Sequence, residues 1–405
     1  MNTKQQERIT VIDALRGFTL FGILIVHVSY LWSFHDPVPV SNLINTSIKF
    51  FIDIFMRGKF YKVFNILFGV SFFIIISRAE AKGVDFRLRF VWRLVILIFI
   101  GWLHELIYTW EALLVYGLFG IPLVFFYKLD KKKVLVLAIS CLAISPFYGI
   151  TYQHLFSNSQ SEEIVQIVDN ERLNIEKNRN ESVQNFFTHA FVHFNDNLKH
   201  STVNRLIYAI KNGPFTIFGL FLFGLFLAKI RFFENTEQKN YLYKKVFYVS
   251  VSIFCLLYGI QTLILKPDSL FGVELSAYKR FLLSNILKSY GSEFFAAILV
   301  SGFMLLYSTR IRSFLDYLIP YGRMGLTNYI SQSIFGLIFF TQPMLGFNNQ
   351  DVMIRVIIAT LFFAFQTFLC SYWLKYFAYG PIEWFWRSAT YLKWIPFRKK
   401  SSINL

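Results

Sequence analysis

The sequence predicts an all-α, polytopic membrane protein with about ten transmembrane helices and both termini in the cytoplasm. Of its 405 residues, 55% are hydrophobic and only 16% are charged, whereas a soluble domain carries about a quarter charged residues. The apolar residues include 49 Phe and gather in runs of roughly 18–22 residues, which is long enough for a helix to cross a bilayer. The mean hydropathy is +0.47. These features exclude an ordinary soluble enzyme.

Ten apolar segments are long enough to span the membrane, several of them near the short limit. We expect spans at about 12–33, 59–77, 91–108, 110–127, 134–152, 214–231, 245–265, 289–307, 322–341 and 353–377. The fourth segment is short enough to be tilted or partly re-entrant. The chain is therefore predicted to form a single integral-membrane domain, residues 1–405.

The net charge of +17 raises the question of nucleic acid binding. The Lys and Arg residues, however, sit in short clusters between apolar runs, and they are more numerous on the side that carries the N-terminus. This is the pattern of the positive-inside rule. We therefore predict a multi-pass protein of the cell (plasma) membrane with a cytoplasmic N-terminus, with the lipid bilayer rather than nucleic acid as its partner.

Two segments outside the spans have a recognisable character. The loop 153–212 is polar with apolar residues at helical spacing, which predicts amphipathic helices over the outer mouth. The second half of 36–58 is typical of an interfacial helix. The three cysteines, Cys141, Cys255 and Cys370, all lie in apolar stretches, which argues against disulfides or a thiolate metal site.

The first span carries two ionisable side chains that anchoring does not require, Arg16 and His27. Eleven residues of helix correspond to three turns plus about 20° and a rise of roughly 16 Å, so the two side chains lie on one face. Ionisable groups inside a membrane span are costly and are usually functional. The alternative is that Arg16 reaches the lipid phosphates and that His27 satisfies a neighbouring helix.

Five stretches resemble the YeiB family, the bacterial membrane proteins grouped as domain of unknown function 418. In chain order they are RITVIDALRGFTLFGILIVH, GKFYKVFNILFG, RLVILIFIGWLHELIYTWEALLVYGLFG, YGRMGLTNYISQSIFG and YGPIEWFWR. They span nearly the whole chain, in the family's order. YeiB-like proteins resemble, more distantly, the acyltransferase-3 enzymes and the heparan glucosaminide acetyltransferase group. That likeness implies transfer of an acyl group, such as acetyl, from cytoplasmic acyl-CoA to an extracytoplasmic hydroxyl or amine.

The resemblance implies catalytic roles for three residues. The family pattern usually has Asn at position 27, and His27 restores the Arg-x10-His spacing of the first helix of acyltransferase-3 enzymes. A neutral imidazole there could take the proton of an acceptor hydroxyl. His104 lies with Glu105 and Glu111 near the next outer turn. The family usually has an acidic residue at the position of Glu111, so Glu111 and His104 are the expected support. The alternative is a hairpin with polar residues at its tip.

Basic residues on the cytoplasmic side are candidates for holding the CoA phosphates. They are Arg16, Arg323, Arg387 and Arg78, with Arg323 close to the start of a helix, where an anion binds favourably. Lys59, at the outer start of the second span, is the candidate for the acceptor side. Positive-inside anchoring is the alternative for each of these cations.

Other chemistries find less support. His189 and His193 could share a metal, but no carboxylate stands at ligand spacing, so we expect no metal site. No cofactor is expected to be bound permanently, because acyl-CoA would be a co-substrate. The acceptor would be an envelope glycan, a lipid or a small molecule. The sequence leaves the oligomeric state open. The rival functions are a transporter or exporter of a small envelope-related solute and a non-catalytic membrane scaffold.

Overall fold

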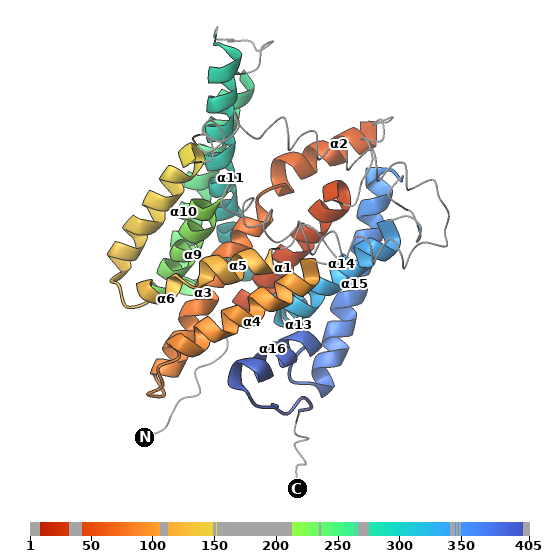
Figure 1. Ribbon diagram of the computed structural model, residues 1–405. Helices are drawn as coiled ribbons and strands as arrows, with labels where there is room; N and C mark the ends of the chain where they lie inside the picture. Colours follow the sequence, from red (N-terminus) through yellow and green to blue (C-terminus); the bar gives the residue numbers. More distant parts are fainter. Residues whose placement is uncertain are drawn as a thin grey trace, which may run out of the picture.

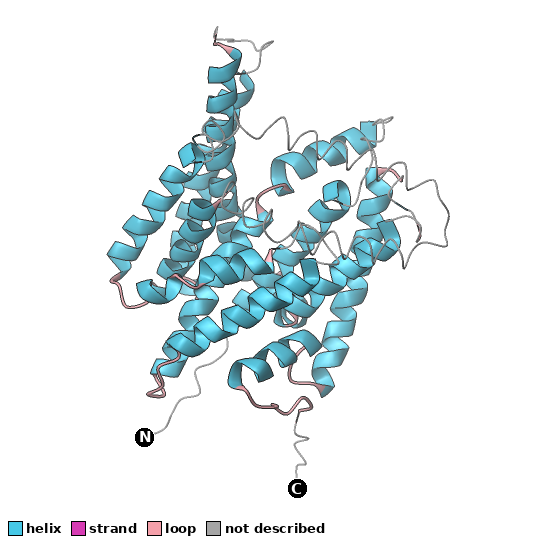
Figure 2. Ribbon diagram, in the orientation of Figure 1, coloured by secondary structure: helices cyan, strands magenta, loops and turns pink. Residues whose placement is uncertain are grey.

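The computed structural model describes residues 9–31, 43–105, 112–148, 151, 213–234, 236–263, 265, 275–340, 345, 347 and 350–399. Over these ranges the chain is helical without β-strands, apart from a single bridge between Phe377 and Arg398 (Figure 2). The all-α prediction is therefore confirmed for the described part of the chain. The predicted amphipathic helices of the loop 153–212 lie outside the described residues.

The helices follow the apolar segments closely. In chain order they are α1 (Thr10–Val26), the π-helix η1 (His27–Leu31), α2 (Leu43–Phe51), the π-helix η2 (Ile52–Met56), α3 (Phe60–Glu80), α4 (Arg87–Glu105), α5 (Leu113–Gly120), α6 (Leu123–Phe126), a helix over 131–148, α9 (Pro214–Lys229), the short η4 (Glu237–Lys239), α10 (Asn240–Leu263), α11 (Ala277–Tyr307), α12 (Arg312–Leu315), α13 (Leu318–Arg323), α14 (Gly325–Phe340), α15 (Val352–Tyr376) and α16 (Pro381–Tyr391).

Five helical stretches in the described residues are long and apolar enough to cross a membrane. They are Thr10–Tyr30, Leu43–Glu80, Glu237–Leu263, Tyr278–Tyr307 and Val352–Tyr376, and the shorter α9 is also apolar. On α15, large apolar side chains such as Leu361 and Phe368 are exposed, as expected where a helix faces lipid. The chain is a helical membrane protein. The count of ten spans stays a prediction.

Two of the predicted spans are interrupted helices. The segment 110–127 is divided into α5 and α6 at Pro122, which has no N–H to continue the helical ladder. The segment 322–341 contains a break at Met324, whose backbone leaves the helical region between α13 and α14. These breaks give the chain helix ends inside apolar sequence, and such ends need polar partners.

Helix α1 runs through the centre of the bundle and contacts α3, α11, α13, α14 and α15 (Figure 1). In the same view α2 lies across the upper end and α16 across the lower end. Leu43, Ile44 and Phe50 of α2 are exposed, and the interfacial helix in the second half of 36–58 stays a prediction.

Glycines allow the closest helix crossings. A Cβ on Gly322 of α13 would overlap the Asp13 carbonyl of α1, and one on Gly17 would overlap the Leu318 carbonyl in return. Gly69 of α3 and Gly224 of α9 make the same kind of reciprocal contact with each other's helices. Small residues at helix crossings are the usual way for membrane helices to pack, because backbone approach maximises van der Waals contact.

Candidate functional site

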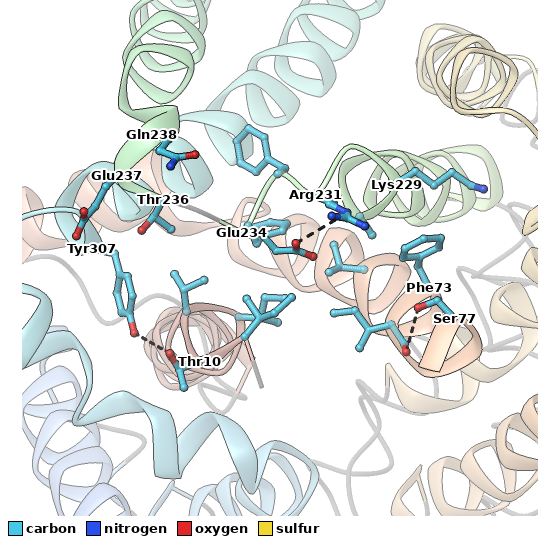
Figure 3. Close-up of a pocket in the computed structure, with 18 of the residues that line it drawn as sticks. Thr10, Phe73, Ser77, Lys229, Arg231, Glu234, Thr236, Glu237, Gln238 and Tyr307 are labelled. Atoms are coloured by element: carbon cyan, nitrogen blue, oxygen red, sulfur yellow. Dashed lines mark hydrogen bonds and ion pairs between the residues drawn. The ribbon is translucent and has the colours of Figure 1, made fainter. Parts of the chain in front are cut away.

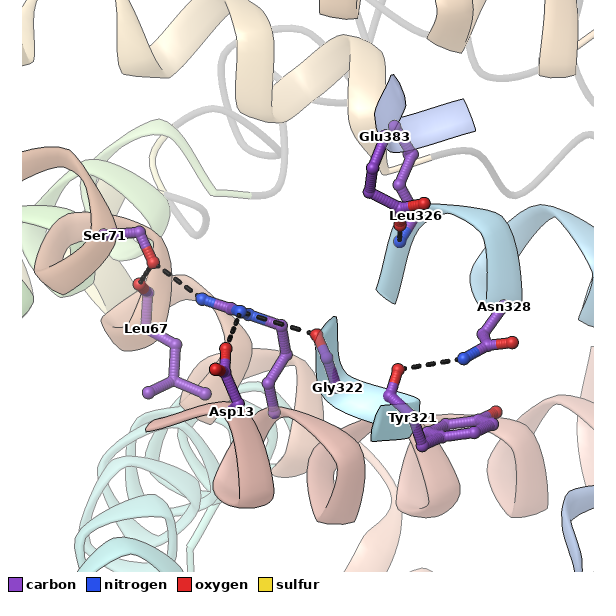
Figure 4. A network of polar contacts seen from close by, with 9 residues as sticks. Asp13, Leu67, Ser71, Tyr321, Gly322, Leu326, Asn328 and Glu383 are labelled. Atoms are coloured by element: carbon purple, nitrogen blue, oxygen red, sulfur yellow. Dashed lines mark hydrogen bonds and ion pairs between the residues drawn. The ribbon is translucent and has the colours of Figure 1, made fainter. Parts of the chain in front are cut away.

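The Arg16 end of α1 is a network of polar contacts within the protein (Figure 4). The Arg16 guanidinium donates to Asp13 Oδ1 at 2.9 Å and to Ser71 Oγ of α3 at 2.9 Å, and it lies 3.5 Å from the Gly322 carbonyl of α13. The Asp13 side chain is only 6% exposed. The geometry therefore gives Arg16 a structural role, since it neutralises a buried carboxylate and ties three helices together.

The N-terminus of α14 is occupied by a carboxylate of the chain itself. Glu383 of α16 accepts hydrogen bonds from the backbone N–H groups of Leu326 and Thr327 at 2.6 and 3.0 Å and from the Thr327 hydroxyl (Figure 4). Burial raises the pKa of this carboxyl above its ordinary value. The sequence suggested a phosphate site at this helix start next to Arg323. The first-turn donors are instead used by Glu383.

A buried polar ladder connects α13, α14 and α15. Gln332 donates to the Tyr321 hydroxyl at 2.7 Å, Tyr321 donates to Gln366 at 3.0 Å, and Gln366 donates to Ser331 at 2.7 Å. Gln332 also lies 3.4 Å from the carbonyl of Leu20, about midway between Arg16 and His27 along α1. Such groups stabilise a membrane interior only when they are bonded to one another.

At the opposite end of α1, two imidazoles converge on one aromatic ring. The His27 ring centroid is 6.5 Å from that of Tyr329 on α14, and the His104 centroid is 5.4 Å from it. His104, at the end of α4, is 3% exposed, and the adjacent Glu105 is 1% exposed. The sequence analysis named both histidines, and the fold brings them to the same neighbour from different helices.

The backbone at His27 is also unusual. His27 is the first residue of the π-helix η1, and single π-helical turns occur frequently at functional sites. Arg355 of α15, which is 4% exposed, donates to the carbonyl of Val28 at 3.2 Å. A cation therefore holds the loosened turn that carries His27. We refer to His27, His104 and Tyr329 as the histidine cluster.

Lys59, the predicted acceptor-side residue, lies near the same end. Its ammonium donates to the carbonyl of Asp53 at 2.9 Å. The Asp53 side chain accepts a hydrogen bond from the hydroxyl of Tyr30, which follows His27 by one turn, and the Arg57 guanidinium lies over the Tyr30 ring at 4.3 Å. Lys59 is thus linked to the turn after His27 through Asp53 and Tyr30.

The four arginines predicted for the donor side lie on four different helices, α1, α3, α13 and α16. Arg16 belongs to the network described above, and Arg323 ends α13. Arg387 of α16 lies over the Tyr379 ring at 5.1 Å, next to the pair in which Arg93 stacks 3.6 Å above Trp386. Arg78, near the end of α3, lines a cavity at the Arg16 end of the bundle.

Several polar residues of interest were missed from the sequence or set aside. Lys62, one turn after Lys59, is buried and its ammonium lies 2.6 Å from Ser292 Oγ and 3.6 Å from Glu293 of α11. Its presence inside an apolar run was the available signal. Glu105 was set aside in favour of Glu111, and Glu105 is buried, at 1% exposed. Tyr329 carries no charge, and its pattern in sequence is that of a core aromatic residue.

Some predicted residues lie outside the described part of the chain. Glu111, His189 and His193 are among them, so their positions are not compared with the prediction. Within the described ranges, no three His, Cys, Asp or Glu side chains gather closely enough to hold a metal ion.

Comparison with known proteins gives a family but no activity. Residues 227–393 match the family model described as protein of unknown function (DUF418). The chain is 29% identical to "Uncharacterized protein YxaH" of Bacillus subtilis (strain 168), covering 99% of this chain and 98% of the relative. It is 27% identical to "Uncharacterized 39.9 kDa protein in amylase 3'region" of Bacillus acidopullulyticus, covering 98% of each. No solved structure matches. The chain therefore carries a DUF418 region at residues 227–393, and the resemblance to the YeiB family predicted from its sequence is confirmed.

Proposed function

We propose that this protein is a membrane acyltransferase that moves an acyl group, such as acetyl, from cytoplasmic acyl-CoA to a hydroxyl or amine on the outer side. The observation that carries the proposal is the histidine cluster: His27 and His104 meet at the ring of Tyr329 in the interior of the bundle. The proposal includes a plasma-membrane location, ten spans and both termini in the cytoplasm.

The reaction needs a base where the acceptor meets the thioester. The acceptor oxygen or nitrogen attacks the carbonyl carbon of the thioester while a neutral imidazole removes its proton, and the carbon–sulfur bond then breaks. The sulfur leaves as the CoA thiolate and takes up a proton. We assign the base to His27, with His104 as its neighbour across Tyr329, and Glu111 stays the proposed carboxylate support. Direct proton transfer requires a base within hydrogen-bond reach of the acceptor group.

The two ends of α1 suit the two substrates. Seventeen residues separate Thr10, at the cavity, from His27, a rise of about 25 Å along the helix. The donor would enter at the Thr10 end with its thioester reaching toward His27. Near His27, Lys59 and Asp53 offer polar groups to the acceptor, which we take to be an envelope glycan, a lipid or a small molecule.

Turnover of radiolabelled acetyl-CoA by the purified protein, with a cell-envelope extract as acceptor, tests the proposal. The change His27→Asn keeps the size and hydrogen bonding of the side chain but removes a base that works near neutral pH. We expect acetyl transfer to fall by about 10²-fold or more, the usual scale of general-base loss. Ser29→Ala is the matched control, because Ser29 lies in the same π-helical turn and its hydroxyl donates only to the Ile25 carbonyl of its own helix.

Donor binding is measured separately. Acetyl-CoA, but not acetate, should raise the melting temperature of both the parent and His27→Asn, since a ligand of the folded state stabilises it. Transfer at the parental rate by His27→Asn would contradict the assignment of the base. Absence of both stabilisation and transfer in the parent would contradict the acyltransferase proposal as a whole.

A solute transporter is the second candidate, and two observations favour it. Discontinuous helices are typical of transporter binding sites, and α5/α6 and α13/α14 are both interrupted. The pair Lys62–Glu293 places opposite charges inside two spanning helices. Solute flux in proteoliposomes without acyl-CoA, abolished by Lys62→Met and retained by His27→Asn, would favour transport over acyl transfer.

A further inference from the structure

A cavity of about 730 Å³ opens at the Arg16 end of the bundle (Figure 3). Its walls come from the first turn of α1, the last two turns of α3, the end of α9 with the chain that follows it, and the ends of the helices around Tyr307 and Arg312. The sequence analysis did not identify this place, because its walls come from segments up to about 300 residues apart in the chain.

The polar lining of the cavity has an excess of positive charge. The charged residues that line it are the cations Arg78, Lys229, Arg231 and Arg312 and the carboxylates Glu234 and Glu237. Four cations against two carboxylates leave a formal charge of +2. Within this lining Arg231 lies 4.0 Å from Glu234, and Arg312 lies 3.9 Å from Asp316, which is not part of the lining. The excess of cations suits the cavity to an anionic group such as a phosphate.

The cation Lys229 is held in place by the protein. The Lys229 ammonium donates to the backbone carbonyl of Tyr127 at 2.7 Å and lies 5.5 Å from the centre of the Phe73 ring. One hydrogen bond to a carbonyl leaves the charge of an ammonium with three donors uncancelled. Lys229 is therefore oriented in advance at the wall of the cavity, which lowers the entropic cost of binding an anion.

Arg231 occupies a strained backbone position. It has φ of 52°, in the left-handed region, at the turn that ends α9. The N–H of Phe232 bonds to the Leu227 carbonyl at 2.9 Å and that of Arg231 to the Ala228 carbonyl at 2.9 Å, the pattern of a helix end at which Gly is preferred. An arginine in place of glycine costs stability here, and backbone strain tends to persist at functional sites.

Most of the remaining lining of the cavity is apolar, including Ile12 of α1, Val70 and Ile74 of α3 and Phe232 after α9. Its uncharged polar members are Thr10, Ser77, Thr236, Gln238 and Tyr307. A ligand that fills the space must therefore combine a phosphate with an apolar or weakly polar body. Two other charged positions at this end of the bundle are engaged within the protein: Arg16 pairs with Asp13, and Glu383 occupies the start of α14.

We propose that this cavity binds a phosphate-bearing amphiphile, whose phosphate is held by Lys229, Arg231, Arg78 and Arg312. Two sources have this chemistry: coenzyme A and its thioesters, and an anionic phospholipid. Binding of coenzyme A rests on the proposed function, in which this cavity would be the donor site. Binding of an anionic phospholipid does not rest on it.

Titration of the full-length protein in phosphatidylcholine nanodiscs tests the proposal, with coenzyme A added from solution in one arm and dioleoyl phosphatidate mixed into the bilayer in the other. Three variants each remove one positive charge: Lys229→Gln, Arg231→Gly and, as the control, Lys244→Gln, which is exposed on α10 and does not line the cavity. The melting temperature without ligand is measured for each.

We expect at least one ligand to bind the parent. Arg231→Gly should weaken that binding about two- to fivefold, because an exposed charge contributes modestly, while the melting temperature stays the same or rises as the strain is relieved. Lys229→Gln should weaken binding about tenfold or more, as a hydrogen bond to a charged group is stronger. Lys244→Gln should bind like the parent.

The proposal is overturned if the parent binds neither ligand. It is also overturned if Lys244→Gln weakens binding as much as Lys229→Gln does, because the attraction would then be generally electrostatic. Binding of phosphatidate without coenzyme A would support the cavity while removing the acyl-CoA donor from the proposed function. Failure of the cavity would leave the assignment of His27 intact, since turnover in His27→Asn is measured independently.

Discussion

The two ends of α1 carry ionisable residues on the same face but use them differently. Arg16 is bound to Asp13, Ser71 and the carbonyl of Gly322, so that its charge is neutralised and three helices are joined. His27 lies in a π-helical turn against Tyr329, with a second imidazole on the same ring. Two ionisable residues on one face of a helix can therefore have different surroundings, an ion pair at Arg16 and an aromatic ring at His27.

The largest effect should come from breaking the Arg16 network. In Arg16→Gln the carboxylate of Asp13 stays buried without its cation, and we expect the free energy of unfolding to fall by about 3–5 kcal/mol. Denaturant unfolding of the purified protein in detergent measures this loss.

The control for this prediction is the double change Asp13→Asn with Arg16→Gln. Because it removes both charges, it should be more stable than Arg16→Gln alone. If the loss of unfolding free energy in the double variant equals the sum of the losses in the two single variants, the ion pair does not stabilise the protein. Arg16 would then again be a candidate for binding the donor.

The crossing of α1 and α13 offers the next test. Gly322→Ala would force a methyl group against the Asp13 carbonyl, and we expect a loss of about 1–3 kcal/mol. Gly325→Ala is the matched control, because its nearest neighbour is the flexible Arg16 Cδ at 3.3 Å. The melting temperatures of Gly322→Ala and Gly325→Ala test this prediction. Equal melting temperatures would show that the close crossing is not what holds Arg16 in position.

The carboxylate at the start of α14 should have a smaller, pH-dependent effect. Glu383→Ala removes a helix cap and should cost about 1 kcal/mol. Because burial raises the pKa of Glu383, the folded state holds its proton to higher pH than the unfolded state does. The contribution of this group to stability is therefore greatest at acidic pH and declines as pH rises through the raised pKa.

Melting temperatures across pH test that sign. In Glu383→Gln the side chain is neutral at every pH, so the decline should become shallower than in the parent. A steeper decline in Glu383→Gln would mean that the ionised carboxylate is the favoured form at this helix start, as an anion-binding site would require.

The smallest stability effect should be at the other end of α1. His27→Asn keeps the approximate size of a side chain that contacts the Tyr329 ring, and we expect the free energy of unfolding to change by less than about 1 kcal/mol. Unfolding under the same conditions as for Arg16→Gln gives the direct comparison. A loss as large as that of Arg16→Gln would make His27 a structural residue and would remove the difference between the two ends.

Much of the fold could be predicted from the sequence because lipid imposes simple requirements. Apolar runs in a bilayer must satisfy their backbone internally, and helices do so, which is why the predicted ranges coincide with the helices. The interruption at Pro122 is also a local effect of one residue. The break at Met324 has no such local cause, and it depends on how α13 and α14 pack.

The site was predictable only in part. The two histidines stood out because ionisable residues in apolar runs are rare. Three other residues did not stand out in the sequence. Tyr329 has the pattern of a core aromatic residue, Lys62 lies near a helix start, and Glu383 lies in an amphipathic segment, so each has an ordinary explanation. Their roles depend on partners 55 or more residues away along the chain.

The sequence by itself determined that this chain is a helical membrane protein that resembles the YeiB family and that Arg16 and His27 share one face of its first helix, because hydropathy and helical periodicity are local properties. Only the tertiary structure decided that Arg16 pairs with Asp13, that Glu383 occupies the start of α14, and that four cations surround a cavity beside α1. Electrostatic and hydrogen-bond partners are set by which helices cross, and in this protein those crossings are made by glycines whose close approach no local pattern specifies.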